Sequence, residues 1–163
     1  MARITTFILT LVCCSLSATS QNSEFKPSFR VIVSKTPTRF RQCSRTVPEK
    51  IKSFWVPTQS DIEVLESNLN SIYDLRANTG GVIGAKVDSL DKFAFQYIGV
   101  IIKGEKYIYI NAFPIGLTER YKKANFDLTQ SLVIVCDGGV SFWGVLFNLN
   151  TKQFTLLSFN GYA

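Results

Sequence analysis

Histidine is absent from the 163-residue chain, and cysteine is scarce, with four residues. Ser-His-Asp and Cys-His catalysis need an imidazole, and so do His-ligated zinc sites, so the chain by itself can supply none of these. A carboxylate pair, a Ser-Lys dyad or the chemistry of a bound cofactor would remain possible, but no spacing in the sequence indicates one. We therefore predict that the protein is not an enzyme and that it holds no catalytic residue, metal or cofactor.

Long apolar runs are absent too, apart from one near the N-terminus. Arg3 precedes an apolar run over residues 4–16, and Ala18-Thr19-Ser20 supplies the small residues of a cleavage site. The run is shorter than the roughly 20 apolar residues that a bilayer span needs. We predict a signal peptide over residues 1–20, with an uncleaved anchor as the alternative. The mature protein is then secreted or periplasmic and has no stable membrane span.

Removal of residues 1–20 would leave Cys43 and Cys136 as the only cysteines. An even number of cysteines in an oxidising compartment favours a disulfide between them. The alternative is a free thiol, because Cys136 ends an apolar run where cysteine can serve as a small buried hydrophobe.

Basic residues are concentrated at the start of the mature chain. Residues 21–52 carry eight bases against two acids, whereas residues 53–163 carry nine bases against ten acids. This asymmetry is typical of an arm or edge segment that meets an anionic partner, and the candidate contacts are Arg39, Arg41 and Arg45. A solvated surface is the plainer alternative. Nucleic acid is not an expected partner, because the protein is predicted to be exported and few aromatic side chains stand among these bases.

Residues 53–163 are predicted to form a single α+β domain that begins with a helix. Pro57 and a Ser60–Glu63 capping box mark the helix start. Apolar residues then recur at helical spacing over about 18 residues, at Ile62, Leu65, Leu69, Ile72 and Leu75. This apolar stripe requires a sheet to pack on.

Alternating apolar residues predict five consecutive strands, over 93–103, 106–113, 131–136, 140–148 and 154–159. Gly104 and the sequence Asp137-Gly138-Gly139 supply the residues that tight hairpin turns require. A further possible strand covers 29–33. The stretch 114–130 has no strand pattern and is either a short surface helix or a functional excursion.

One long N-terminal helix packed on a curved antiparallel meander of about five strands resembles the cystatin-like or NTF2-like arrangement. The resemblance runs from about Pro57 to Phe159 and concerns the order of the elements. Cystatin inhibitors contact their targets with a Gln-Val-x-Val-Gly type of loop and a Pro-Trp hairpin, and neither occurs here. The resemblance therefore implies a fold and no functional residues.

Aromatic side chains give both faces of the strand 140–148 apolar bulk. One helix covers only one face, so the other needs the N-terminal segment, a second copy of the chain, or a ligand or target protein. Polar-tipped side chains suit a partly wet binding face, and the candidates are Tyr97, Tyr107, Tyr109, Asn111 and Trp143. Packing within the sheet is the alternative for these residues.

Together these features favour an exported, non-enzymatic binding module that recognises a protein or a cell-envelope polymer, as an inhibitor or immunity factor does. One alternative is a small-molecule carrier with a pocket between helix and sheet, lined by Leu69, Ile72, Ile98 and Val145. Another is a structural protein of the envelope. A homodimer is a further alternative that would cover the second face.

Overall fold

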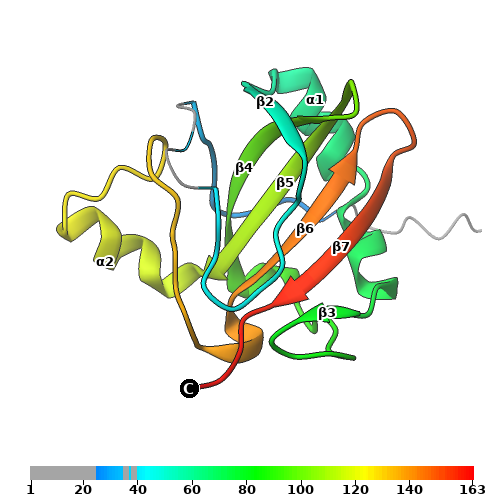
Figure 1. Ribbon diagram of the computed structural model, residues 1–163. Helices are drawn as coiled ribbons and strands as arrows, with labels where there is room; N and C mark the ends of the chain where they lie inside the picture. The colour runs from blue at the N-terminus through cyan, green and yellow to red at the C-terminus, as the bar shows by residue number, and fades with distance from the viewer. Residues whose placement is uncertain (1–24, 35–36, 38–39) are drawn as a thin grey trace, which may run out of the picture.

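A computed structural model describes residues 25–34, 37 and 40–163, so the predicted signal peptide lies outside the described residues. These residues form one seven-stranded mixed sheet in the order β1-β4-β5-β6-β7-β3, with β2 also paired to β4 (Figure 1). The strands are β1 Arg30–Ile32, β2 Ile51–Trp55, β3 Thr79–Gly80, β4 Phe93–Ile102, β5 Glu105–Pro114, β6 Trp143–Asn148 and β7 Gln153–Phe159. Two short helices, α1 Gln59–Glu66 and α2 Thr118–Lys123, accompany the sheet. Among the described residues, no helix is long and apolar enough to cross a membrane.

The two hairpins at the centre of the sheet match the sequence prediction closely. In the β4–β5 hairpin, Ile102 pairs with Glu105, so Lys103 and Gly104 form a two-residue turn. Both turn residues have positive φ, as the tight turns that match strand twist require. The β6–β7 hairpin pairs Asn148 with Gln153. Its register shifts between Gly144 and Leu146, which is a β-bulge.

The predicted fold class is wrong in two respects: the sheet is mixed rather than an antiparallel meander, and no long helix among the described residues packs on it. Parallel pairing of β1 with β4 and of β3 with β7 makes the sheet mixed. β1 pairs with one half of the free edge of β4, and β2 pairs antiparallel with the other half. The segment that the sequence predicts as a basic arm thus contributes strands to the sheet edge.

Helix α1 has eight residues instead of about 18, because local hydrogen bonds end it. Its capping box lies two residues earlier than predicted, between Thr58 and Asp61. At the other end, the side chains of Ser67 and Asn68 both donate to the carbonyl of Val64, in competition with further backbone bonds. A 3₁₀ helix over Leu69–Asp74 then continues the buried stripe, since a spacing of three residues suits its period.

Residues 131–136 are not a strand, although their composition predicts one. Their backbone groups bond to side chains instead of to a neighbouring strand. The amide of Val133 donates to Oε1 of Gln96, and its carbonyl accepts from Gln42 and Asn111. The Asp137-Gly138-Gly139 sequence accordingly forms no hairpin, and it leads into a 3₁₀ turn over Gly139–Ser141.

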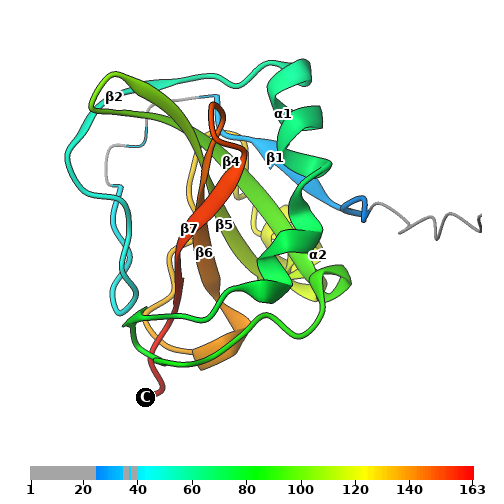
Figure 2. The ribbon, with the colours of Figure 1, turned by 90° about the vertical axis from the view of Figure 1, so that its right-hand side faces the viewer.

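Both faces of the sheet are covered by the chain itself (Figure 2). On one face, α1 and the following 3₁₀ helix pack on the largest buried cluster, which includes Ile62, Phe95 and Val145. On the other face, residues of the segment 40–54 pack on a second cluster around Ile98 and Val100. The predicted second apolar face is therefore filled by the N-terminal segment, which was one of the three alternatives.

Cys43 and Cys136 lie at disulfide distance, with an S–S separation of 2.11 Å. The bridge joins the segment 40–46 to the loop that leads into β6, across 93 residues of sequence. This pair confirms the predicted partners and is compatible with an oxidising, extracellular environment.

Candidate functional site

The five residues predicted to form a binding face are divided between the two sides of the sheet. Tyr97 and Trp143 belong to the cluster beneath α1, whereas Tyr107 and Tyr109 contact the opposite cluster. All except Tyr107 are at most 1% exposed, Asn111 included. The structure therefore does not bring them together as one exposed surface: four of the side chains pack inside the protein, and Tyr107 is half-buried.

The three arginines of the predicted anionic-partner segment have different environments. Arg39 lies outside the described residues, and Arg41 is exposed. Arg45 is 6% exposed and points into the protein. Its guanidinium donates to the hydroxyl of Tyr109 and to the side-chain oxygens of Asn111 and Asn160. Within the described residues, no carboxylate forms an ion pair with Arg45.

Arg45 is part of a buried polar network that holds several segments together. Asn111 donates to Oε1 of Gln96 at 2.8 Å and to the carbonyl of Val133 at 3.0 Å. Gln96 in turn donates to the carbonyls of Leu128 and Ser131. Because buried polar groups are stable only when they are hydrogen-bonded, this network fixes the irregular loop 128–133 against the sheet.

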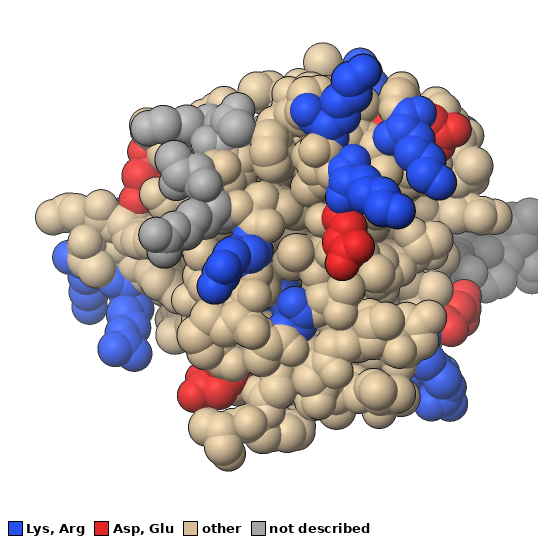
Figure 3. All heavy atoms as spheres, in the orientation of Figure 1, with Lys and Arg blue, Asp and Glu red and all other residues tan. Residues whose placement is uncertain are grey.

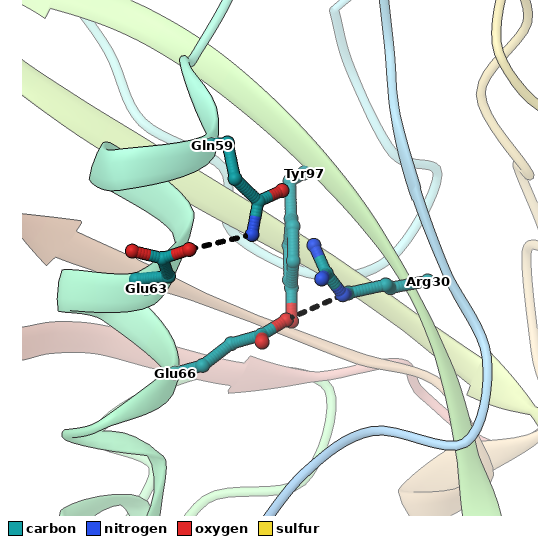
Figure 4. Close-up of polar contacts among 5 residues, drawn as sticks. All are labelled: Arg30, Gln59, Glu63, Glu66 and Tyr97. Carbon is teal, nitrogen blue, oxygen red and sulfur yellow. Dashed lines mark hydrogen bonds and ion pairs between the residues drawn. The ribbon is translucent and has the colours of Figure 1, made fainter.

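A first recess, of about 270 Å³, lies beside α1 and is lined by Lys26, Arg30, Gln59, Glu63 and Glu66. Figure 4 shows Arg30 and the ring of Tyr97 both reaching the carboxylate of Glu66. Nε of Arg30 is 2.8 Å from Oε1 of Glu66, and the hydroxyl of Tyr97 donates to the same oxygen at 3.1 Å. Two bases and two acids line this recess, so its positive and negative charges are equal in number. The ion pair from Arg30 anchors α1 to β1, and the hydrogen bond from Tyr97 anchors α1 to β4.

Burial raises the pKa of Tyr97 far above its ordinary value, and the Glu66 carboxylate raises it further. The native state therefore holds the phenol proton at a pH where the unfolded chain, with an ordinary pKa of about 10, releases it. The contribution of this retained proton to the free energy of unfolding is complete below pH 10 and is lost as the pH rises above 10. We expect the free energy of unfolding to fall there by roughly 1.4 kcal/mol per pH unit for this group. Urea titrations of wild type and Tyr97→Phe between pH 9 and 11 measure this fall, and an equal slope in both proteins would contradict the assignment.

A second and larger recess, of about 610 Å³, lies between α2 and the loop before β6, and we call it the α2 cleft. In Figure 1, α2 stands at the side of the molecule, and the loop passes between it and the sheet. The α2 wall and the loop wall together consist of Pro114, Leu117, Arg120, Tyr121, Val135, Asp137, Gly138, Ser141 and Phe142. The sequence signal for this site was the stretch 114–130, which has no strand pattern.

The loop wall of the α2 cleft is fixed firmly to the body of the protein. Asn160, fully buried at the end of β7, donates to the carbonyls of Val135 and Asp137 at 2.6 and 2.9 Å. The Ser44 hydroxyl donates to the carbonyl of Cys136 at 2.6 Å, next to the disulfide. Gly138 has φ 88°, and a Cβ there would lie 2.6 Å from the ring of Phe142, so both backbone and packing require glycine.

The α2 wall is held by aromatic contacts instead. The ring of Tyr121 lies 5.7 Å from that of Phe113 in an edge arrangement and 5.1 Å from that of Phe126. Desolvation raises the pKa of Tyr121, so its hydroxyl remains a neutral donor and acceptor at physiological pH. A short helix held by packing alone is easier to displace than the opposite wall.

The chemistry of the α2 cleft suits recognition. Leu117, Val135 and Phe142 provide apolar surface, while Arg120 and Asp137 bring opposite charges from the two walls. Neither of these two forms an ion pair with another described residue. Within residues 25–34, 37 and 40–163, no group of three or more acidic or cysteine side chains is placed to hold a metal ion.

Comparison with protein-family models, with curated proteins and with solved structures finds no match to this chain. Its function must therefore be inferred from the chemistry of its own surface. The α2 cleft is the best candidate, because it combines half-buried apolar side chains with two charges that form no ion pair with another described residue, whereas the recess beside α1 has equal numbers of acids and bases and an ion pair between Arg30 and Glu66.

Proposed function

We propose that the protein is an exported, non-enzymatic binding module that recognises a protein or cell-envelope polymer through the α2 cleft. The observation that carries this proposal is the combination of a solvent-open apolar recess of about 610 Å³ with the opposite charges of Arg120 and Asp137. Apolar surface supplies affinity, and the two charges can orient a partner that carries both a donor and an acceptor, as an extended peptide does.

The loop wall adds apolar surface beyond the recess. Ile134 and Val140, in the same loop, are 44% and 40% exposed. Neither side chain lines the cleft itself, but exposed apolar side chains on one loop favour a surface that a partner covers. The rigid loop wall also supports recognition, since a site that is already ordered loses less entropy on binding.

The carrier alternative gains no support from the packing of its predicted lining residues. Leu69, Ile72 and Val145 are fully buried in the cluster beneath α1, and Ile98 belongs to the cluster on the opposite face. These side chains fill the core between helix and sheet. For this reason the α2 cleft, rather than a pocket under the helix, carries the proposed function.

A displayed library of random twelve-residue peptides, selected on the purified protein, tests this proposal. We expect selected peptides to bind at least about tenfold more weakly to Leu117→Asp. A carboxylate placed on the apolar part of the α2 wall must be desolvated when the peptide binds. Arg120→Glu should weaken binding as well, since it removes one of the two orienting charges. Titration of each selected peptide by calorimetry measures both effects.

Ile83→Asp is the matched control, because Ile83 is 74% exposed and lies outside the cleft lining. This variant makes the same kind of change, from an apolar side chain to aspartate, and should bind like the wild type. Selected peptides that bind equally well to wild type, Leu117→Asp and Arg120→Glu would show that the α2 cleft is not the recognition site.

A further inference from the structure

Lysines gather at one end of the sheet, around the turns that join β4 to β5 and β6 to β7. We call this group the tip lysines; its members are Lys50, Lys52, Lys103, Lys106 and Lys152. Strand pairing brings the three segments together, because Ile51 pairs with Ile102 and Tyr107 pairs with Asn148. Figure 3 shows basic side chains clustered over this end of the molecule, where Figure 1 places the two turns.

Three of the tip lysines have a backbone conformation that lysine rarely adopts. The φ angles of Lys50, Lys103 and Lys152 are 57°, 52° and 55°. Glycine and asparagine adopt this left-handed region at lower cost, and the β4–β5 turn is of the kind that favours asparagine before glycine. Backbone preference therefore does not explain lysine at these positions, and the property that the three residues share is a positive charge.

Five lysines outnumber the two nearby acids, Glu49 and Glu105, so the tip keeps a net positive charge. Glu105 accepts hydrogen bonds from the hydroxyl of Tyr107 and from the side chain of Asn148, both at 3.0 Å. Among the residues that the structure describes, no ion pair joins a tip lysine to an acid. Lys106 lies over the ring of Trp55, 4.6 Å from its centroid. The other four ammonium groups are left to attract an external anion.

An apolar recess of about 580 Å³ opens beside Lys52, lined also by Phe40, Pro48, Ile51, Ser53 and Phe54. The aromatic rings of Phe40 and Phe54 contact each other there, with centroids 5.5 Å apart. A partner that meets both the lysines and this recess must carry negative charge next to apolar groups. An anionic lipid bilayer has this combination, whereas a soluble polyanion has only the charge.

We propose that the tip lysines and the adjacent recess form a docking surface for an anionic membrane, separate from the α2 cleft. The lysines act as point charges for lipid phosphates, which suits a surface without fixed geometry. The β4–β5 and β6–β7 turns lie at the same end of the sheet, so their lysines can meet one surface (Figure 1). This attachment would keep the binding module at a membrane surface while its cleft stays free for a partner.

Sedimentation of the purified protein with vesicles tests the proposal, using phosphatidylcholine alone or mixed equally with phosphatidylglycerol. We expect binding only to the mixed vesicles and weaker binding at high salt. The variant Lys50→Asn, Lys103→Asn, Lys152→Asn should bind the mixed vesicles about a hundredfold more weakly, because each lysine near an anionic surface contributes about a fivefold gain. Its Tm should equal or exceed that of the wild type, since asparagine tolerates positive φ better than lysine does.

The matched control is Lys86→Gln, Lys122→Gln, Lys123→Gln, which removes three exposed charges away from the tip. Its affinity for the mixed vesicles should stay much closer to that of the wild type than the affinity of the tip variant does. The proposal would be overturned by failure of the wild type to bind mixed vesicles, by equal losses in the two triple variants, or by full displacement from vesicles by polyphosphate. The last result would identify a soluble polyanion as the partner instead.

Discussion

Joint replacement of Cys43 and Cys136 by alanine is expected to lower the free energy of unfolding by roughly 4 kcal/mol. The bridge spans 93 residues of sequence, so its loss frees a long loop in the unfolded chain. Both cysteines are exposed, and their removal therefore leaves no large cavity in the core. Urea unfolding of the double variant, followed by tryptophan fluorescence, measures this loss.

Reduction of the wild-type protein provides an independent check of the same quantity. Dithiothreitol should bring the wild type down to the stability of the double alanine variant and should leave that variant unchanged. The slope of the urea transition should also increase without the bridge, because the unfolded chain then exposes more surface. Wild-type protein that unfolds at the same urea concentration with and without reductant would contradict the prediction.

The disulfide also bears on the proposed recognition site. Cys136 lies next to Asp137, which belongs to the loop wall of the α2 cleft. The Ser44 hydroxyl donates to the carbonyl of Cys136. Without the bridge, only hydrogen bonds would hold this wall to the body of the protein, among them those of the Asn160 side chain and of the Ser44 hydroxyl. We expect peptides selected on the wild type to lose affinity for the double alanine variant even under conditions where it remains folded, since a mobile wall must be ordered on binding.

Local pattern predicted the central hairpins well, because alternation and turn residues act over a few neighbouring positions. The possible strand over 29–33 is confirmed as β1, whereas β2 and the two-residue β3 were not predicted, because they depend on pairing with distant segments. Helix length was overestimated because apolar spacing does not distinguish an α-helix from a following 3₁₀ helix that buries the same stripe. Ser67 and Asn68 decide where the α-helix ends, because their side chains donate hydrogen bonds to the carbonyl of Val64.

The candidate site was harder to predict than the fold, since its two walls lie far apart in the sequence. Residues 114–121 and 135–142 become neighbours only after the loop between them is fixed by Gln96 and Asn111. Composition predicted Tyr109 and Asn111 as an exposed binding face because their tips are polar. In the structure, the polar groups of Tyr109 and Asn111 accept hydrogen bonds from Arg45, which the sequence analysis predicted to lie on a basic surface.

Arg45 gives the sharpest test of this buried network. We expect Arg45→Met to lower the free energy of unfolding by roughly 3 kcal/mol, although methionine fills much of the same apolar space. The loss arises because the side-chain oxygens of Tyr109 and Asn160 would remain buried without the guanidinium donor, while that of Asn111 would keep only its bond from Gln42; a buried group left without its partner costs about 1–3 kcal/mol.

Arg45→Lys should recover only part of that stability, since an ammonium group cannot reproduce the planar fork that reaches all three oxygens. Arg41→Met is the matched control: Arg41 is exposed four residues earlier, and its replacement should change the free energy of unfolding by no more than about 0.5 kcal/mol. Urea denaturation of the three variants measures these differences. If Arg45→Met proved as stable as Arg41→Met, Arg45 would not be the group that binds the N-terminal segment to the sheet.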